Sequence, residues 1–286
     1  MVLLFRQKKG KFQSQPFFED LWGFKTNWTN PQDGWTEEKR KLRIAEHFNT
    51  IQQSSAMQAF TKLGYMKTKI PDKILQKILQ HKKQKPISTE ACYNLKGFTN
   101  CEFINSNGTL GKAKYILFQY SLELTLNVSL ESKHNIKVID FAKPEYVNLH
   151  MEIVSKIQPI IENWSGQKLS SRNVALFGIR RYLRGSWMSL HVDKLPDRIL
   201  SAILQIDQKV DEDWPLTIID NQGNKQKINL KPGEMLLYES AKVPHGRPFP
   251  LNGDFYDNVF IHFQPLNWIP PEELICEDRH SYFPCH

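Results

Sequence analysis

Residues 186–207 read SWMSLHVDKLPDRILSAILQID, two short apolar runs that are separated by the turn-forming residues DKLPD. Short runs that are rich in β-branched and apolar residues and end at Pro, Asp or Gly are typical of β-strands. Similar runs occur on both sides of it between residues 166 and 265, including NVALFGIRRYL, WPLTIID, EMLLYES and NVFIHFQP. The turn sequences DNQGN, KPGE and HGRPFPLNGD separate them. Many short strands at this spacing predict a sandwich or barrel of antiparallel sheets.

The chain before residue 166 has a mainly helical pattern. Apolar residues recur at helical spacing in three segments, residues 36–63, 71–84 and 144–165. The first of them opens at Thr36, an N-cap residue that is followed by two acids. Residues 92–142 are strand-like and irregular in between. We expect an α+β fold in which these N-terminal helices pack on the outer face of the β-rich core.

These patterns divide the chain into three regions. Residues 1–35 hold Gly, Pro, Asn and Gln with scattered aromatics and predict an extended arm. Residues 36–165 form a helical and mixed region that buttresses the core, and residues 166–286 form the core itself. With 286 residues, of which 40% are hydrophobic and 12% aromatic, the chain is long enough for one large domain with an appendage.

The positive charge of the chain is concentrated in its first third. The net charge is +8, but residues 1–90 carry 17 Lys and Arg against 8 Asp and Glu, and the other 196 residues carry 21 against 22. Such a region could meet nucleic acid, an acidic peptide or a membrane surface. A solvated helical face explains the lysines more simply, and no nucleic-acid-binding motif accompanies them. We therefore expect no nucleic-acid partner.

Signals of the cellular compartment point in two directions. The opening residues MVLLFRQKKGKF hold too few apolar residues for a secretory signal, and no run is long enough to span a bilayer. These features favour a soluble protein of the cytoplasm over one of the secretory lumen. Conversely, the four cysteines can form two pairs in an oxidising compartment, Cys92 with Cys101 and Cys276 with Cys285. Asn-x-Ser/Thr sequons begin at Asn27, Asn107, Asn127 and Asn163, although asparagine-rich chains produce them by chance.

His191 and Asp193 form a candidate metal-binding pair. A β-strand repeats every two residues, so both side chains of SLHVDK project from one face and can reach one cation. The spacing alone is weak evidence, because nine His and thirteen Asp predict ~0.4 such pairs by chance. His150 and Glu152 have the same spacing within a predicted helix. Residues two apart on a helix point roughly 200° away from each other, so that pair is structural.

A third ligand has to come from the histidines downstream, His245, His262, His280 and His286. His245 lies after the predicted strand EMLLYES and before the last strand. Two imidazoles and one carboxylate leave open positions on the metal, which is the arrangement of non-haem Fe(II) oxygenases. The alternative is a turn histidine that is satisfied by local hydrogen bonds.

The ordered series YLRGSWMSLHVDK, SAILQID, PLTIID, LKPGEMLLYES and HGRPFPLNGDFYDNVFIHFQP resembles the core of 2-oxoglutarate/Fe(II)-dependent dioxygenases, specifically the prolyl 4-hydroxylase-like group. The resemblance covers residues 174–265, and upstream LGYMKTKIPDKILQKI resembles the opening strand and helix of that group. It implies a double-stranded β-helix (jelly-roll) core. It also implies that His191, Asp193 and His245 bind the iron and that Tyr182 hydrogen-bonds 2-oxoglutarate.

The chain departs from this family where the cosubstrate is anchored. The family places Lys or Arg about ten residues after the second histidine ligand, and here Phe255 lies near that position. We expect Arg247 to take this role, with Arg181 and Arg184 as alternatives. His262 could orient the cosubstrate or be a satisfied core histidine. Where relatives carry a Gly-Gly-Glu-Thr-like turn, this chain has Trp214, which we expect to pack the sheet.

The resemblance implies an enzyme that uses Fe(II), 2-oxoglutarate and O2, with ascorbate as reductant, to hydroxylate a C–H bond with release of succinate and CO2. Its leading substrate is a prolyl residue of a protein or peptide. A free amino acid or other small metabolite is the alternative substrate. Two further alternatives are a non-catalytic jelly-roll binding module and a cupin-like enzyme with another metal. The sequence leaves the oligomeric state open.

Overall fold

The computed structural model describes residues 49–84, 91–95, 98–104, 110–115, 136–139 and 147–276. The arm expected at residues 1–35 and the start of the first predicted helix lie outside these ranges. Within them the chain has a sheet-rich α+β fold with few helices. In the described part of the chain, no helix is both long and apolar enough to cross a membrane.

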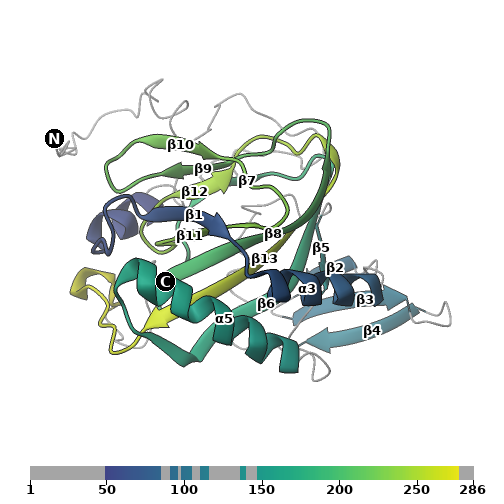
Figure 1. Cartoon of the computed structure of the whole chain (residues 1–286), viewed down its shortest axis with the longest axis horizontal. Coiled ribbons are helices and arrows are strands. Elements are labelled where there is room, and N and C mark those ends of the chain that lie inside the picture. The colour runs from purple at the N-terminus through teal and green to yellow at the C-terminus, as the bar shows by residue number, and fades with distance from the viewer. Residues whose placement is uncertain are drawn as a thin grey trace.

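Two antiparallel sheets form the core (Figure 1). The six-stranded major sheet has the order β1-β11-β8-β13-β6-β5. Its strands are β1 (Tyr65–Lys69), β11 (Glu234–Tyr238), β8 (Leu200–Val210), β13 (Gly253–Pro265), β6 (Leu169–Leu183) and β5 (Ile136–Ile139). The minor sheet has the order β10-β9-β12-β7, with β10 (Lys225–Ile228), β9 (Leu216–Ile219), β12 (His245–Arg247) and β7 (Met188–His191). From β6 onward the chain passes back and forth between the sheets.

Strands are also found within the segment that was predicted to be strand-like and irregular. A third sheet joins β2 (Ala91–Leu95), β3 (Phe98–Ile104) and β4 (Leu110–Tyr115) as a meander. Cys92 and Cys101, which could pair in an oxidising compartment, lie directly opposite each other in the register of β2 and β3. Cys276 is disulfide-bonded, and its expected partner Cys285 lies outside the described residues.

Helices α3 (Asp72–Gln84) and α5 (Val147–Ser165) cover the outer face of the major sheet, as Figure 1 shows. Both match predicted helices. Their buried isoleucines share one core with outward-facing residues of the major sheet: Ile74, Ile78, Ile153, Ile157, Ile161, Leu204, Leu237, Val259 and Ile261. Fully burying such a side chain contributes roughly 1.5–3 kcal/mol. This core therefore fixes the helices to the sheet. After β13 the chain forms a short 3-10 helix (Glu272–Leu274).

The first predicted helix ends earlier than expected. Residues 49–56 are helical, but the chain then bends instead of continuing to residue 63. The reason is a distant carboxylate: Glu239 accepts hydrogen bonds from the backbone N–H groups of Phe60 at 3.1 Å and Thr61 at 2.7 Å. These N–H groups are satisfied outside a helix, so the helix can stop.

Strand β8 is buried on both faces. Leu200, Ala202 and Leu204 face the helices, and Ile203 belongs to a second cluster between the two sheets. This double burial explains why its sequence is continuously apolar instead of alternating. The space between the sheets also contains an aromatic cluster of Tyr182, Trp214, Leu251 and Tyr256. The candidate site lies in this interior.

Candidate metal centre

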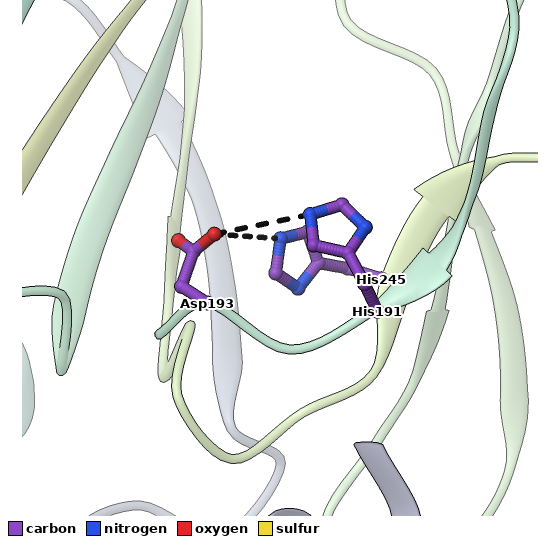
Figure 2. A group of neighbouring side chains, drawn as sticks. All are labelled: His191, Asp193 and His245. Carbon is purple, nitrogen blue, oxygen red and sulfur yellow. Dashed lines mark ion pairs between the residues drawn. The ribbon is translucent and has the colours of Figure 1, made fainter. Parts of the chain in front are cut away.

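Strands β7 and β12 bring His191, Asp193 and His245 together. His191 is the last residue of β7 and lies opposite His245, the first residue of β12. One donor atom of each of the three residues lies within 4.8 Å of the others. Asp193 Oδ1 is 3.8 Å from His191 Nε2 and 3.9 Å from His245 Nε2, and Figure 2 shows the three side chains pointing toward one another. No other such group occurs within the described ranges.

Asp193 does not reach the cluster in the way that strand alternation predicts. Strand β7 ends at His191, so Asp193 lies in the loop beyond the strand. Its backbone N–H donates to the Ser240 carbonyl at 2.8 Å. Asp193 is therefore placed by a contact with a segment nearly fifty residues away, whereas His191 and His245 are held by the strand ladder.

The imidazole of His245 has the tautomer and the charge state of a neutral nitrogen ligand. Its Nδ1 lies 2.9 Å from the carbonyl oxygen of Val243. Because a carbonyl can only accept, Nδ1 carries the proton and Nε2 presents its lone pair to the cluster. Burial and the neighbouring His191 lower the pKa of His245 to about 4, against the opposing charge of Asp193. An uncharged imidazole is the form that binds metals.

Asp193 is the anionic member of the cluster. Burial alone raises the pKa of its carboxyl, but the interaction with His262 and the charges of His262, His245 and His191 outweigh burial. The net result is a pKa well below the usual range. Two imidazoles and one ionised carboxylate form a donor set that suits a divalent transition metal.

His262, on β13, contacts the Asp193 carboxylate. The His262 Nδ1 atom lies 3.3 Å from Asp193 Oδ2 and 2.7 Å from Ser201 Oγ. Ser240 Oγ donates to the Arg198 carbonyl, so the 2.5 Å contact between the two serines needs Ser201 as its donor. Ser201 can then only accept from His262, which places a proton on Nδ1. His262 therefore lies in contact with Asp193, one of the three predicted metal ligands.

Arg247 is fully buried, and two of its guanidinium nitrogens have no hydrogen-bond partner among the described residues. Its guanidinium carbon lies 4.7 Å from the ring centre of Trp214 and 4.9 Å from that of Tyr256. Nε donates to the Trp214 carbonyl at 3.4 Å, and Nη1 and Nη2 have no hydrogen-bond partner among the described residues. A buried cation with two unused nitrogens is costly without a partner, so this position suits an anionic group.

The two alternative arginines do not point into this interior. Arg181 makes a bidentate pair with Asp257, at 2.7 Å for both bonds. Arg184 is more than half exposed and pairs with Asp211 at 2.7 Å. Of the three arginines that the sequence put forward, Arg247 is the one buried beside the aromatic cluster.

Tyr182 lies in the aromatic cluster, with its ring centre 5.2 Å from that of Trp214. Trp214 packs as expected and donates from Nε1 to the Phe249 carbonyl at 2.7 Å. Sequence reasoning missed Arg180, whose Nη1 lies 3.5 Å from the Tyr182 hydroxyl. The available signal was its spacing, because residues two apart on a strand share a face.

Comparisons with known proteins give matches among solved structures only. No protein-family model matches the chain, and no curated protein does. The chain is similar to a Pseudomonas putida prolyl-4-hydroxylase, at 12% identity and a TM-score of 0.45 over 75% of this chain and 100% of that one. A Trichoplax adhaerens prolyl hydroxylase in complex with a hypoxia inducible factor peptide fragment has 11% identity and a TM-score of 0.42, over 82% and 95%. A viral collagen prolyl hydroxylase of Paramecium Bursaria Chlorella virus-1 has 10% identity and a TM-score of 0.39, over 70% and 95%.

Proposed function

We propose that the chain is an Fe(II)- and 2-oxoglutarate-dependent hydroxylase. The observation that carries the proposal is the convergence of His191, Asp193 and His245 between two sheets. The passage of the chain back and forth between these sheets supports a double-stranded β-helix (jelly-roll) core. The order of sequence segments around the three residues, which resembles 2-oxoglutarate/Fe(II)-dependent dioxygenases, supports the same reading.

The donor set fits Fe(II). Its imidazoles are borderline ligands and its carboxylate is a hard one, a combination that first-row divalent metals accept. His245 is neutral and Asp193 is ionised in the folded protein, so neither has to lose a proton at neutral pH. Three protein ligands leave coordination positions for small molecules.

Arg247 and Tyr182 are the residues that we propose for 2-oxoglutarate. A dicarboxylate needs one partner at the metal and a second at its far end. The two unpaired Nη atoms of Arg247 offer a bidentate site for that far carboxylate. Tyr182 lies in the same aromatic cluster and brings a hydroxyl group. Arg180, next to that hydroxyl, adds positive charge to the same region.

When bound, iron and 2-oxoglutarate would supply the oxidative decarboxylation that releases succinate and CO2 and hydroxylates a C–H bond with O2. The chain itself binds, orients and shields these reactants. Trp214, Tyr256 and Leu251 are almost completely buried, and the rings of Trp214 and Tyr256 lie against the Arg247 guanidinium. His262 lies 3.3 Å from the Asp193 oxygen that points away from the two other ligands, so its ring restricts the orientations that the carboxylate can take.

For the substrate we propose a prolyl residue of a protein or peptide, with ascorbate as the external reductant. The support is the prolyl 4-hydroxylase-like order of the sequence segments. A free amino acid or other small metabolite is the alternative. Tandem mass spectrometry of a peptide library after incubation distinguishes them, because fragmentation shows whether the added oxygen atom lies on a proline.

The reaction class is tested without knowing the substrate. We expect purified protein with Fe(II), ascorbate and 2-oxoglutarate to release succinate slowly through uncoupled turnover. The variant Asp193→Ala should release none above background. His150→Ala is the matched control, because His150 and Glu152 repeat the ligand spacing on helix α5. No succinate and no bound iron would favour a binding module, and bound iron without succinate would favour a cupin-like enzyme.

A further inference from the structure

The main chain of Asp193 is held by a residue from the N-terminal helix. Gln53, which is 3% exposed, donates from Nε2 to the Asp193 carbonyl at 2.7 Å. The same nitrogen donates to the Ala241 carbonyl at 2.9 Å. An amide NH2 group has two hydrogens, so both are used. One side chain thus bridges the segment of one predicted ligand and the segment that leads to His245.

The segment that leads to His245 also donates hydrogen bonds back to the helix that carries Gln53. Lys242 Nζ donates to the carbonyls of Ser54 at 3.1 Å and Met57 at 2.6 Å. Ser54 belongs to the last turn of the helix and Met57 directly follows it, a position at which a cation also interacts favourably with the helix dipole. Residues 49–57 and the loop 239–243 therefore bond each other reciprocally.

Glu239 completes this attachment. Its carboxylate accepts from Phe60 N and from both the N–H and the hydroxyl of Thr61, at 3.1, 2.7 and 2.6 Å. Glu239 itself is fully buried. The loop 239–243 thus holds the helix at its last turn and just beyond it, while Gln53 reaches from the helix into the metal centre.

We propose that Gln53 is a positioning residue of the metal centre, through which docking of residues 49–57 sets the relative placement of Asp193 and His245. This inference rests on the proposed function. Asp193 lies beyond the end of β7, so no strand ladder fixes its carbonyl. Without Gln53, two buried carbonyl groups lose their donor, and the two ligand segments lose the side-chain bridge that reinforces the backbone bond from Asp193 to Ser240. Part of the N-terminal region is then a component of the site and more than a buttress.

The test measures Mn(II) affinity, with free Mn(II) quantified by electron paramagnetic resonance, in the full chain. We expect Gln53→Met, which keeps length and apolar packing, to bind Mn(II) about tenfold more weakly or worse, as is typical when groups that orient ligands are lost. The matched control is Gln158→Met. Gln158 Nε2 also donates to a backbone carbonyl, that of Leu169 at 3.2 Å, but it joins α5 to β6. This control should keep wild-type Mn(II) affinity.

A second variant keeps the test decisive if Gln53→Met does not fold. Lys242→Met leaves the Gln53 bonds in place but weakens helix docking, so we expect a smaller loss of Mn(II) affinity. Wild-type affinity in the folded variants, with only a lower melting temperature, would overturn the inference and leave a structural role. No Mn(II) binding by the wild-type chain would instead overturn the metal centre, and this inference with it.

Discussion

The imidazole of His245 is kept neutral by its surroundings before any metal binds. Burial lowers its pKa to about 4, and the Val243 carbonyl fixes the proton on Nδ1. The arrangement has an energetic cost at acidic pH, because the same histidine in the unfolded chain takes up a proton near pH 6.5. The group that makes a good ligand therefore weakens the metal-free fold as the pH falls.

This cost predicts a pH dependence of stability. Between pH 6.5 and about pH 4 the unfolded chain binds more protons at His245 than the folded chain does. The free energy of unfolding of the metal-free protein should fall with pH in this window, by up to about 1.4 kcal/mol per pH unit from this group. Urea unfolding at several pH values measures it. In His245→Gln the slope of the free energy of unfolding against pH should be smaller by up to about 1.4 kcal/mol per pH unit, which corresponds to one proton. An equal slope in the variant would contradict a lowered pKa of His245.

Arg247 is a second residue whose buried surroundings are unfavourable until a ligand binds. We expect Arg247→Met to raise the KM for 2-oxoglutarate at least about 30-fold, since losing a buried charged partner costs about 2–5 kcal/mol. Uncoupled succinate release at varied 2-oxoglutarate measures this effect. Arg184→Met, which changes an exposed arginine, is the control.

The same variant has a second readout in the absence of ligand. The two unpaired nitrogens of Arg247 are buried, so Met at this position should leave the melting temperature of the protein without ligand unchanged or raise it. An unchanged KM for 2-oxoglutarate would transfer the anchoring role to Arg180, which lies beside Tyr182.

Among the elements, strand β13 contributes functionally distinct side chains to the two faces of the major sheet. Its inner face presents Tyr256 to the aromatic cluster and His262 to Asp193. Its outer face presents Val259 and Ile261 to the helices. Asp257 is fully buried on this strand and pairs with Arg181 of β6 and with Lys82 of α3, at 2.8 Å for the latter. The charged group thus joins a helix to two strands.

This junction predicts a large stability effect. Asp257→Ala leaves the mostly buried Arg181 without its bidentate partner and Lys82 with Asp207 alone, so we expect a loss of about 2–4 kcal/mol in the free energy of unfolding. Urea denaturation measures the loss. Asp254→Ala is the control on the same strand, because Asp254 is half-exposed and its pair with Lys209 contributes little. Equal effects of the two substitutions would contradict the role of Asp257.

The elements that the sequence predicted well are those whose pattern is local. Helices α3 and α5 follow from apolar spacing, and the strands after residue 166 follow from short runs between turns. The helix end at residue 56 did not follow, because Glu239 determines it from a distance of nearly 180 positions. The position of Asp193 beyond β7 escaped prediction for the same reason.

At the scale of the whole molecule, the site is assembled from segments that meet only after folding. The three predicted ligands could be named from the sequence because their order resembles that of a known family. The choice among Arg247, Arg181 and Arg184 stayed open, because it depends on which strand face turns inward. Gln53 gave no sequence signal at all, since its contacts lie 140 and 188 positions away.

The most direct test of the central claim is the number of metal ions that one chain binds. We expect equilibrium dialysis of the wild-type chain against Fe(II) without oxygen to give one tightly bound ion per chain. Asp193→Ala and His245→Ala should lose this ion, while His150→Ala should keep it. A wild-type chain that retains no ion, or ligand variants that bind as tightly as wild type, would contradict a metal centre at His191, Asp193 and His245.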